Sequence, residues 1–118
     1  MKTLFILCLI TMSLFHANSA AAHAVVTDYS LKMHPIHANQ PDKVVMTFNS
    51  EIELSLSQVF LVSKGDKHEL LKFGNGEKQG QIIVEVPALE AGDYAIKFKV
   101  FAADGHLTED VIHFSVTQ

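Results

Sequence analysis

The sequence contains little cysteine, no tryptophan and no arginine. Its one cysteine, Cys8, lies in the apolar segment at the start of the chain, so the rest can form neither a disulfide nor a thiolate metal site. After residue 22 there are 8 lysines against 13 acidic residues, a balance of −5 with histidine neutral. This balance argues against a nucleic-acid-binding protein, which needs a basic patch to neutralise phosphates.

Long hydrophobic runs are also missing, except at the start. The apolar run from Leu4 to Leu14 follows Met1 and Lys2 and precedes small and polar residues. It is too short to cross a bilayer, which takes about 20 helical residues. We interpret residues 1–22 as a secretory signal peptide that is removed, and expect an exported protein without stable membrane insertion.

The cleavage position decides which residue begins the exported chain. Ala20 and Ala22 satisfy the preference for small residues before the cut, which would make His23 the new N-terminus. Cuts one residue earlier or two residues later obey the same rule. A cut two residues earlier is disfavoured, because Asn18 is a poor residue three positions before the cut. Residues 23–118 are enough for one domain.

Hydrophobic residues alternate with period two through this domain, which is typical of strands with one buried face. Glycine, proline, asparagine or aspartate bounds each run, as turns require. The expected strands are 24–29, 44–48, 59–61, 69–73, 82–86, 94–100 and 112–116. Residues 31–42 and 73–77 are expected to be loops. Seven short strands at this spacing predict an all-β, immunoglobulin-like β-sandwich.

Two features of the chain carry metal chemistry: the terminal His23 and the triplet Asp104-Gly105-His106 between the last two strands. A terminal histidine can chelate one ion through its α-amino nitrogen and its imidazole. With the imidazole of His106 and a carboxylate oxygen of Asp104, the set has three nitrogens and one oxygen, which suits tetragonal Cu(II). Gly105 tolerates backbone angles that let its neighbours converge.

A simpler interpretation of the triplet is a turn, with the aspartate capping it and the histidine exposed to solvent. The spacing in the sequence does not establish that His23 and the triplet lie at the same end of a sandwich. A histidine at a predicted cleavage site is uncommon, however, because histidine is a rare residue. The two features together favour a copper site.

Four stretches carry a resemblance to a known family: His23-Ala24, "PDKVVMTFNSEIE" from Pro41, "LEAGDYAIKFKVFAADGH" from Leu89, and the closing "HFSVTQ". Together they resemble the CopC/PcoC-type periplasmic copper-resistance domain, including its YobA-like members. The resemblance spans essentially the whole of residues 23–118.

The resemblance implies a seven-stranded Greek-key sandwich that binds one Cu(II) ion through His23, Asp104 and His106. It also implies a protein that sequesters copper, confers resistance, or delivers the ion to a CopD-type inner-membrane transporter. Such a protein is not an enzyme.

The chain departs from the family pattern at several positions. Many members carry a methionine-rich loop for Cu(I), whereas here only Met33 and Met46 follow the signal segment, and Met46 is expected in the core. We therefore expect a Cu(II)-only protein. Phe98 stands where the family commonly has tryptophan. Residues 107–110 replace a proline and small residues and are expected to be exposed.

The remaining histidines leave one alternative open. His34 and His37 flank Pro35 and could form a second, weaker copper or zinc site, although the proline argues against a helix that would align them. His68 and His113 are expected to be exposed.

Two other functions compete with copper carriage. An oxidative polysaccharide-cleaving enzyme also uses a terminal-histidine chelate, but it needs an open copper face and exposed aromatic residues. A metal-free structural or adhesion sandwich would be favoured if the exported chain began at a residue other than His23. One exception is a chain that begins at Ala21, because an Ala-Ala-His terminus can also bind Cu(II) through backbone nitrogens.

Overall fold

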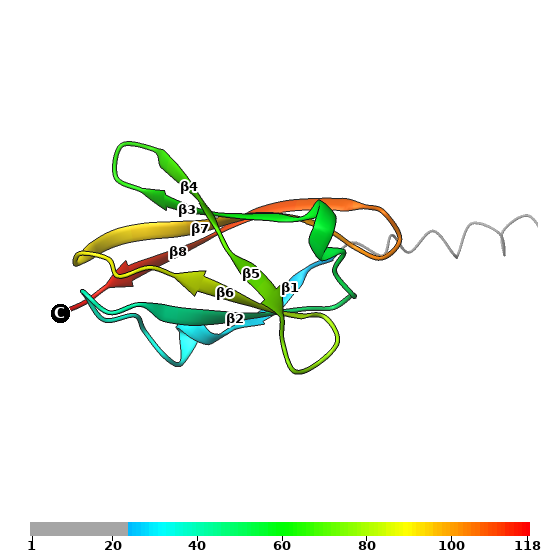
Figure 1. Ribbon diagram of the computed structural model, residues 1–118, viewed down its shortest axis with the longest axis horizontal. Helices are drawn as coiled ribbons and strands as arrows, with labels where there is room; N and C mark the ends of the chain where they lie inside the picture. Colours follow the sequence, from blue (N-terminus) through cyan, green and yellow to red (C-terminus); the bar gives the residue numbers. More distant parts are fainter. Residues whose placement is uncertain (1–23) are drawn as a thin grey trace, which may run out of the picture.

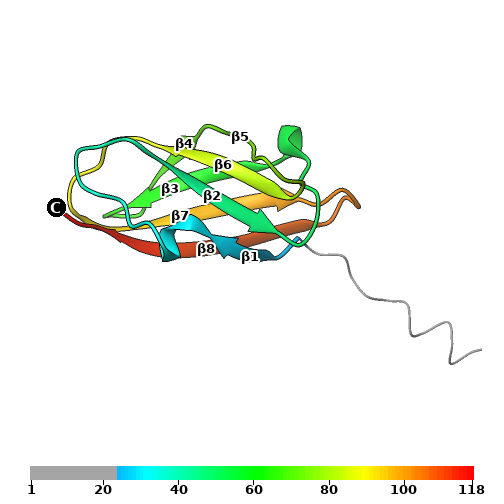
Figure 2. The ribbon, with the colours of Figure 1, turned by 90° about the horizontal axis from the view of Figure 1, so that it is seen from below.

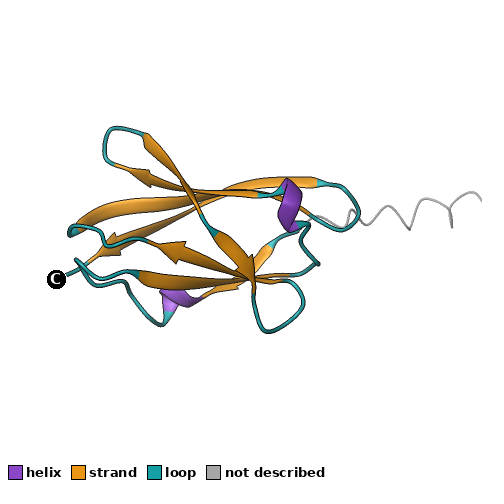
Figure 3. Cartoon of the chain, in the orientation of Figure 1, coloured by secondary structure: helices purple, strands orange, loops and turns teal. Residues whose placement is uncertain are grey.

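The computed structural model describes residues 24–118, which form two antiparallel four-stranded sheets packed face to face (Figure 1). The strands are β1 (Val26–Tyr29), β2 (Asp42–Phe48), β3 (Gln58–Ser63), β4 (Lys67–Leu71), β5 (Phe73–Asn75), β6 (Gln81–Val86), β7 (Gly92–Phe101) and β8 (Leu107–Val116). Two short 3₁₀ helices, η2 (Ser30–Lys32) and η3 (Leu54–Leu56), lie in the connections (Figure 3). Within this part of the chain, no helix has the length and apolar character needed to span a membrane.

The order of the strands is that of an immunoglobulin-like fold. One sheet has the order β1-β2-β6-β5 and the other the order β4-β3-β7-β8. The chain therefore crosses between the sheets after β2, after β4 and after β6. This is the arrangement of the two sheets in immunoglobulin domains. The prediction of an all-β, Greek-key, immunoglobulin-like sandwich is confirmed.

The core lies between the sheets and follows the predicted alternation. The inward-facing residues of the central strands are buried, namely Val44, Met46 and Phe48 of β2, Ile82, Val84 and Val86 of β6, and Ile96, Phe98 and Val100 of β7. The rings of Phe48 and Phe98 meet edge to face across the two sheets, with centroids 5.6 Å apart. Met46 is a core residue, as expected. Apolar packing joins the two sheets.

The strand expected at 69–73 is in fact two strands in different sheets. β4 pairs with β3 and β5 pairs with β6, and the chain changes sheets at Lys72. The carbonyl of Lys72 accepts the backbone N–H of Glu85 at 2.9 Å, which joins the crossing to β6. The described residues therefore contain eight strands instead of seven, and the loop expected at 73–77 begins as a strand. Alternation alone does not reveal such a crossing, because the pattern continues through it.

β8 is longer than its hydrophobic pattern indicated. It pairs with β7 along its whole length, from Leu107 opposite Phe101 to Val116 opposite Gly92. The first half of β8 is largely exposed and polar because it lies at the edge of the sheet, and this hid it from a search for alternation. Residues 107–110 are therefore strand, and the loop between β7 and β8 is confined to residues 102–106.

Candidate metal centre

The start of β1 and the loop at 102–106 lie at the same end of the sandwich. Figures 1 and 2 show the beginning of the described chain (blue) and the β7–β8 loop (orange) at this end in two perpendicular views. Hydrogen bonds support the placement, since residues 49–53, which follow β2, bond both to Val25 and to residues 101–103. The sequence had left this point open.

Asp104 and His106 contact each other within the loop. One carboxylate oxygen of Asp104 accepts the backbone N–H of His106 at 3.1 Å, and the other lies 2.9 Å from Nδ1 of the imidazole. Gly105 between them has φ of +88°, a conformation that favours glycine, and its N–H bonds to the carbonyl of Ala102. The convergence expected of this triplet is therefore present.

The distance between the two side chains is that of a hydrogen bond, and it is also compatible with two ligands of one ion. Two donors that each lie about 2.0–2.1 Å from an ion, at a right angle, are about 2.9 Å apart. Oδ2 of Asp104 and Nδ1 of His106 have this separation. Both side chains also reach solvent, and that of His106 is 56% exposed. Binding of one ion by both atoms would replace the hydrogen bond between them.

The base of the loop is held by the segment that follows β2. Ile52 and Ala102 form an isolated antiparallel bridge, and hydrogen bonds of 2.9 and 3.0 Å between residues 51–53 and residues 101–103 lie on either side of it. Ala102 and Ile52 are both buried. The loop is thus attached to the core directly beside its two candidate ligands.

Ser57 joins the segment after β2 to the end of β7 by hydrogen bonds from inside the sandwich. It is the one buried polar residue in the described part of the chain, with an exposure of 7%. Its hydroxyl donates to the carbonyl of Glu53 at 2.8 Å and accepts the backbone N–H of Phe101 at 3.0 Å. This role of Ser57 could not be predicted from the sequence, because nothing around it distinguishes it from Ser55, two residues earlier.

The residues next to His23 are fixed to the fold. Ala24 is fully buried, and Val25 makes two hydrogen bonds with Asn49. His23, the third predicted ligand, lies outside the described residues. Within residues 24–118, no three histidine, cysteine or acidic side chains gather into a group that could hold a metal ion.

The other histidines lie away from this loop. His68 and His113 are exposed, as predicted, and Nε2 of His68 lies 2.8 Å from Oδ1 of Asp66. His34 and His37 are exposed in the connection between β1 and β2. His37 pairs with Thr117, just beyond the end of β8 that is remote from the loop at 102–106.

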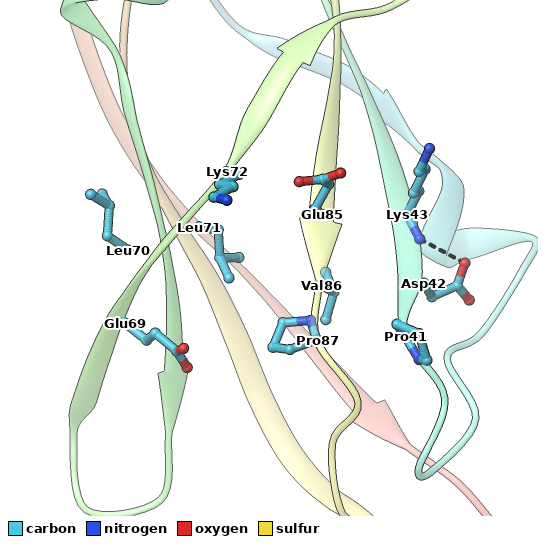
Figure 4. A pocket seen from close by; sticks show the side chains of 10 residues that line it. All are labelled: Pro41, Asp42, Lys43, Glu69, Leu70, Leu71, Lys72, Glu85, Val86 and Pro87. Carbon is cyan, nitrogen blue, oxygen red and sulfur yellow. Dashed lines mark hydrogen bonds between the residues drawn. The ribbon is translucent and has the colours of Figure 1, made fainter.

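A groove of about 510 Å³ lies between β4 and the paired strands β2 and β6 (Figure 4). It combines apolar and charged side chains and contains none of the three predicted ligands. Its lining consists of Pro41, Asp42, Lys43, Glu69, Leu70, Leu71, Lys72, Glu85, Val86 and Pro87.

Comparison with known proteins identifies the family. Residues 26–117 match the model of the CopC domain. The chain belongs to the CopC domain family. Members of this family are copper-binding resistance proteins and not enzymes, which agrees with the prediction that this chain is not an enzyme. No curated protein matches the chain.

Solved structures of CopC proteins share the fold. CopC from Methylosinus trichosporium OB3b is 28% identical, with a TM-score of 0.67 over 80% of this chain and 94% of that one. PcoC from Escherichia coli, described as a methionine-rich copper resistance protein, is 18% identical, with a TM-score of 0.63 over 81% of this chain and 100% of that one. At the latter identity the likeness concerns the fold alone.

The methionines of this CopC domain protein match the sequence expectation. Only two follow residue 22. Met46 is buried in the core and Met33 is 78% exposed in the connection between β1 and β2. Of the tyrosines and phenylalanines of residues 24–118, Phe48 and Phe98 are buried and the others are half-buried.

Proposed function

We propose that this CopC domain protein is exported to the periplasm and binds one Cu(II) ion at the end of the sandwich that carries the β7–β8 loop. The ligands are the α-amine and imidazole of His23, a carboxylate oxygen of Asp104 and the imidazole of His106. The observation that carries the proposal is the 2.9 Å pair of Asp104 and His106, at the end of the sandwich where the described chain begins.

The donor set determines the ion. Three nitrogens and one oxygen in a plane suit tetragonal Cu(II), whereas Cu(I) is selected by soft thioether and thiolate ligands. Met33 is far from the proposed site, because its connection pairs with the opposite end of β8 through His37. Met46 is enclosed in the core. Thioether ligands are thus absent from the proposed set, which supports a Cu(II)-only protein.

An exposed site suits carriage of the ion. With three residues filling the four equatorial positions, little room is left for a substrate, and this favours holding the ion over turnover. The exposed imidazole of His106 can be approached by the ligands of a second protein. Sequestration, resistance, or delivery to a CopD-type inner-membrane transporter are the roles consistent with such a site.

A comparison of two double variants tests the proposal. Asp66 and His68, at the turn between β3 and β4, form a pair with the same spacing and a similar contact of 2.8 Å, and so provide a matched control. In the exported protein, replacing Asp104 and His106 by alanine should abolish high-affinity Cu(II) binding in a competition titration. Replacing Asp66 and His68 should leave it unchanged. Equal affinity in both double variants would contradict the proposed site.

A further inference from the structure

We propose that Asn49 is a positioning residue for the terminal ligand His23. This inference rests on the proposed copper site and assigns to Asn49 the role of holding the chain end toward Asp104 and His106. Asn49 directly follows β2 and is itself outside the proposed set of ligands.

Asn49 binds Val25 through two hydrogen bonds. The side-chain oxygen Oδ1 of Asn49 accepts the backbone N–H of Val25 at 2.7 Å, and the backbone N–H of Asn49 donates to the carbonyl of Val25 at 3.0 Å. The side chain of Val25 is 51% exposed, so packing contributes little to fixing this residue. The two hydrogen bonds, with the buried Ala24, are what fix the backbone next to His23.

The side chain of Asn49 accepts a hydrogen bond that a backbone carbonyl would accept in a regular strand pair. Val26 is paired with Phe48, the last residue of β2. In an antiparallel ladder a hydrogen-bonded pair exchanges two backbone bonds. Here the N–H of Val25 bonds to the amide oxygen of the side chain instead of to the backbone carbonyl of Asn49.

Because of this side-chain hydrogen bond, the segment of residues 49–53 contacts both the start of β1 and the β7–β8 loop. The backbone after Asn49 leaves β1, and residues 51–53 then pair with residues 101–103 at the base of the β7–β8 loop. Because the side chain of Asn49 bonds to Val25, the backbone after Asn49 can cross to the other sheet while the start of β1 stays hydrogen-bonded. The same short segment therefore positions the residue that follows Ala24 and the loop that carries Asp104 and His106.

Fixing the chain end should strengthen Cu(II) binding. Binding of copper restricts the motion of His23 and the residues beside it, and this costs conformational entropy. The part of this entropy that is already lost in the copper-free protein does not weaken binding. Without the side-chain acceptor, about one further residue of backbone has to be ordered by the metal. We expect Asn49→Ala to weaken Cu(II) binding about tenfold, in line with the cost of ordering one residue.

The experiment compares three variants of the exported protein that begins at His23. Asn49→Ala removes the acceptor, and Asn49→Asp retains an oxygen in the same place. Thr27→Val is the matched control, because Oγ1 of Thr27 also joins β1 to β2, by donating to the carbonyl of Thr47 at 3.2 Å, but lies farther from the terminus. Cu(II) affinity, electron paramagnetic resonance of the Cu(II) form, and amide exchange of Val25 in the copper-free protein are measured.

We expect Asn49→Ala to bind more weakly, to exchange the amide of Val25 faster without copper, and to show a second Cu(II) species with fewer nitrogen ligands. Asn49→Asp should restore the wild-type spectrum, and Thr27→Val should keep the wild-type affinity and spectrum. Wild-type behaviour of Asn49→Ala, or the same losses in Thr27→Val, would overturn the role of Asn49. If the unaltered protein lacks a spectrum with three nitrogens, the proposed copper site itself fails.

Discussion

At the scale of single residues, the site depends on donors that must be deprotonated to bind a metal. An α-amine ordinarily titrates at about 7.7–8.0 and a histidine at about 6.5, so protons compete with Cu(II) for such nitrogens. The deprotonated forms bind the ion, and the Cu(II) affinity should therefore fall steeply as the pH drops below about 6. Competition titrations of the exported protein at several pH values check this. An affinity that stays flat across the range would exclude a site built from amine and imidazole nitrogens.

Gly105 contributes its backbone conformation to the same site. A Cβ at this position would meet no atom within 4 Å, so the cost of a side chain comes from the φ of +88° alone. We expect Gly105→Ala to destabilise the fold by about 1–2 kcal/mol, the cost of a left-handed conformation, and to weaken Cu(II) binding because the loop can relax. Urea unfolding and Cu(II) titration measure the two effects.

Gly74 in β5 is the matched control for this substitution. It also has open space around the position of a Cβ, but its φ is not in the left-handed region. Gly74→Ala should keep the Cu(II) affinity of the unaltered protein. If the two alanine variants behave alike, the conformation of Gly105 has no special part in the site.

Asp104 and His106 could be named as candidate ligands from the sequence. The contacts by which Asn49 and Ser57 hold the backbone near them could not be predicted. The spacing of an aspartate, a glycine and a histidine is visible in one short stretch. The contacts of Asn49 with Val25 and of Ser57 with Phe101 join residues 24 and 44 positions apart. Nothing local in the sequence encodes such pairings, because they depend on how the strands cross between the sheets.

At the scale of elements, the connection from β2 to β3 is the structure on which the candidate site rests. It pairs with residues 101–103 and contains η3, and Ser57 closes it. Ser57→Ala would leave the partly buried backbone N–H of Phe101 without its acceptor, while the carbonyl of Glu53 would keep only the N–H of Leu56. An unsatisfied buried group costs about 1–3 kcal/mol. We expect a loss of stability of that size, measured by urea unfolding.

Ser55 in η3 provides the control, because it is exposed and two residues away. Ser55→Ala should change the free energy of unfolding by less than about 0.5 kcal/mol, as is usual for surface positions. A Ser57→Ala variant as stable as Ser55→Ala would show that the bonds of Ser57 do not support the base of the loop.

The strands were predicted well where one face is buried and poorly where the chain lies at an edge. β2, β6 and β7 lie inside the sheets, and their alternation is regular. The first half of β8 and the crossing at Lys72 were misread, because edge strands need fewer apolar residues and a change of sheet leaves the alternation intact. The late start predicted for β8 concerned the site, since it made the loop around Asp104 longer than it is.

At the scale of the whole molecule, the sandwich could be predicted because turn residues and short alternating runs recur at regular spacing. The placement of the start of β1 beside the β7–β8 loop could not, since it depends on the order of the strands in the sheets. The fold brings residues that are about 80 positions apart in the sequence to one end. The predicted signal segment and His23 lie outside the described residues, so both remain predictions about the exported protein.

The central claim is that the amine of His23 is a ligand, and one spectroscopic comparison tests it most directly. Electron paramagnetic resonance is recorded for the Cu(II) form of protein that begins at His23 and of protein that retains Ala22, with mass spectrometry to verify each terminus. The account predicts three equatorial nitrogens and one oxygen for the first protein, and a different spectrum with weaker binding for the second, because the added alanine moves the amine away from the imidazole. Identical spectra and affinities for the two proteins would contradict it.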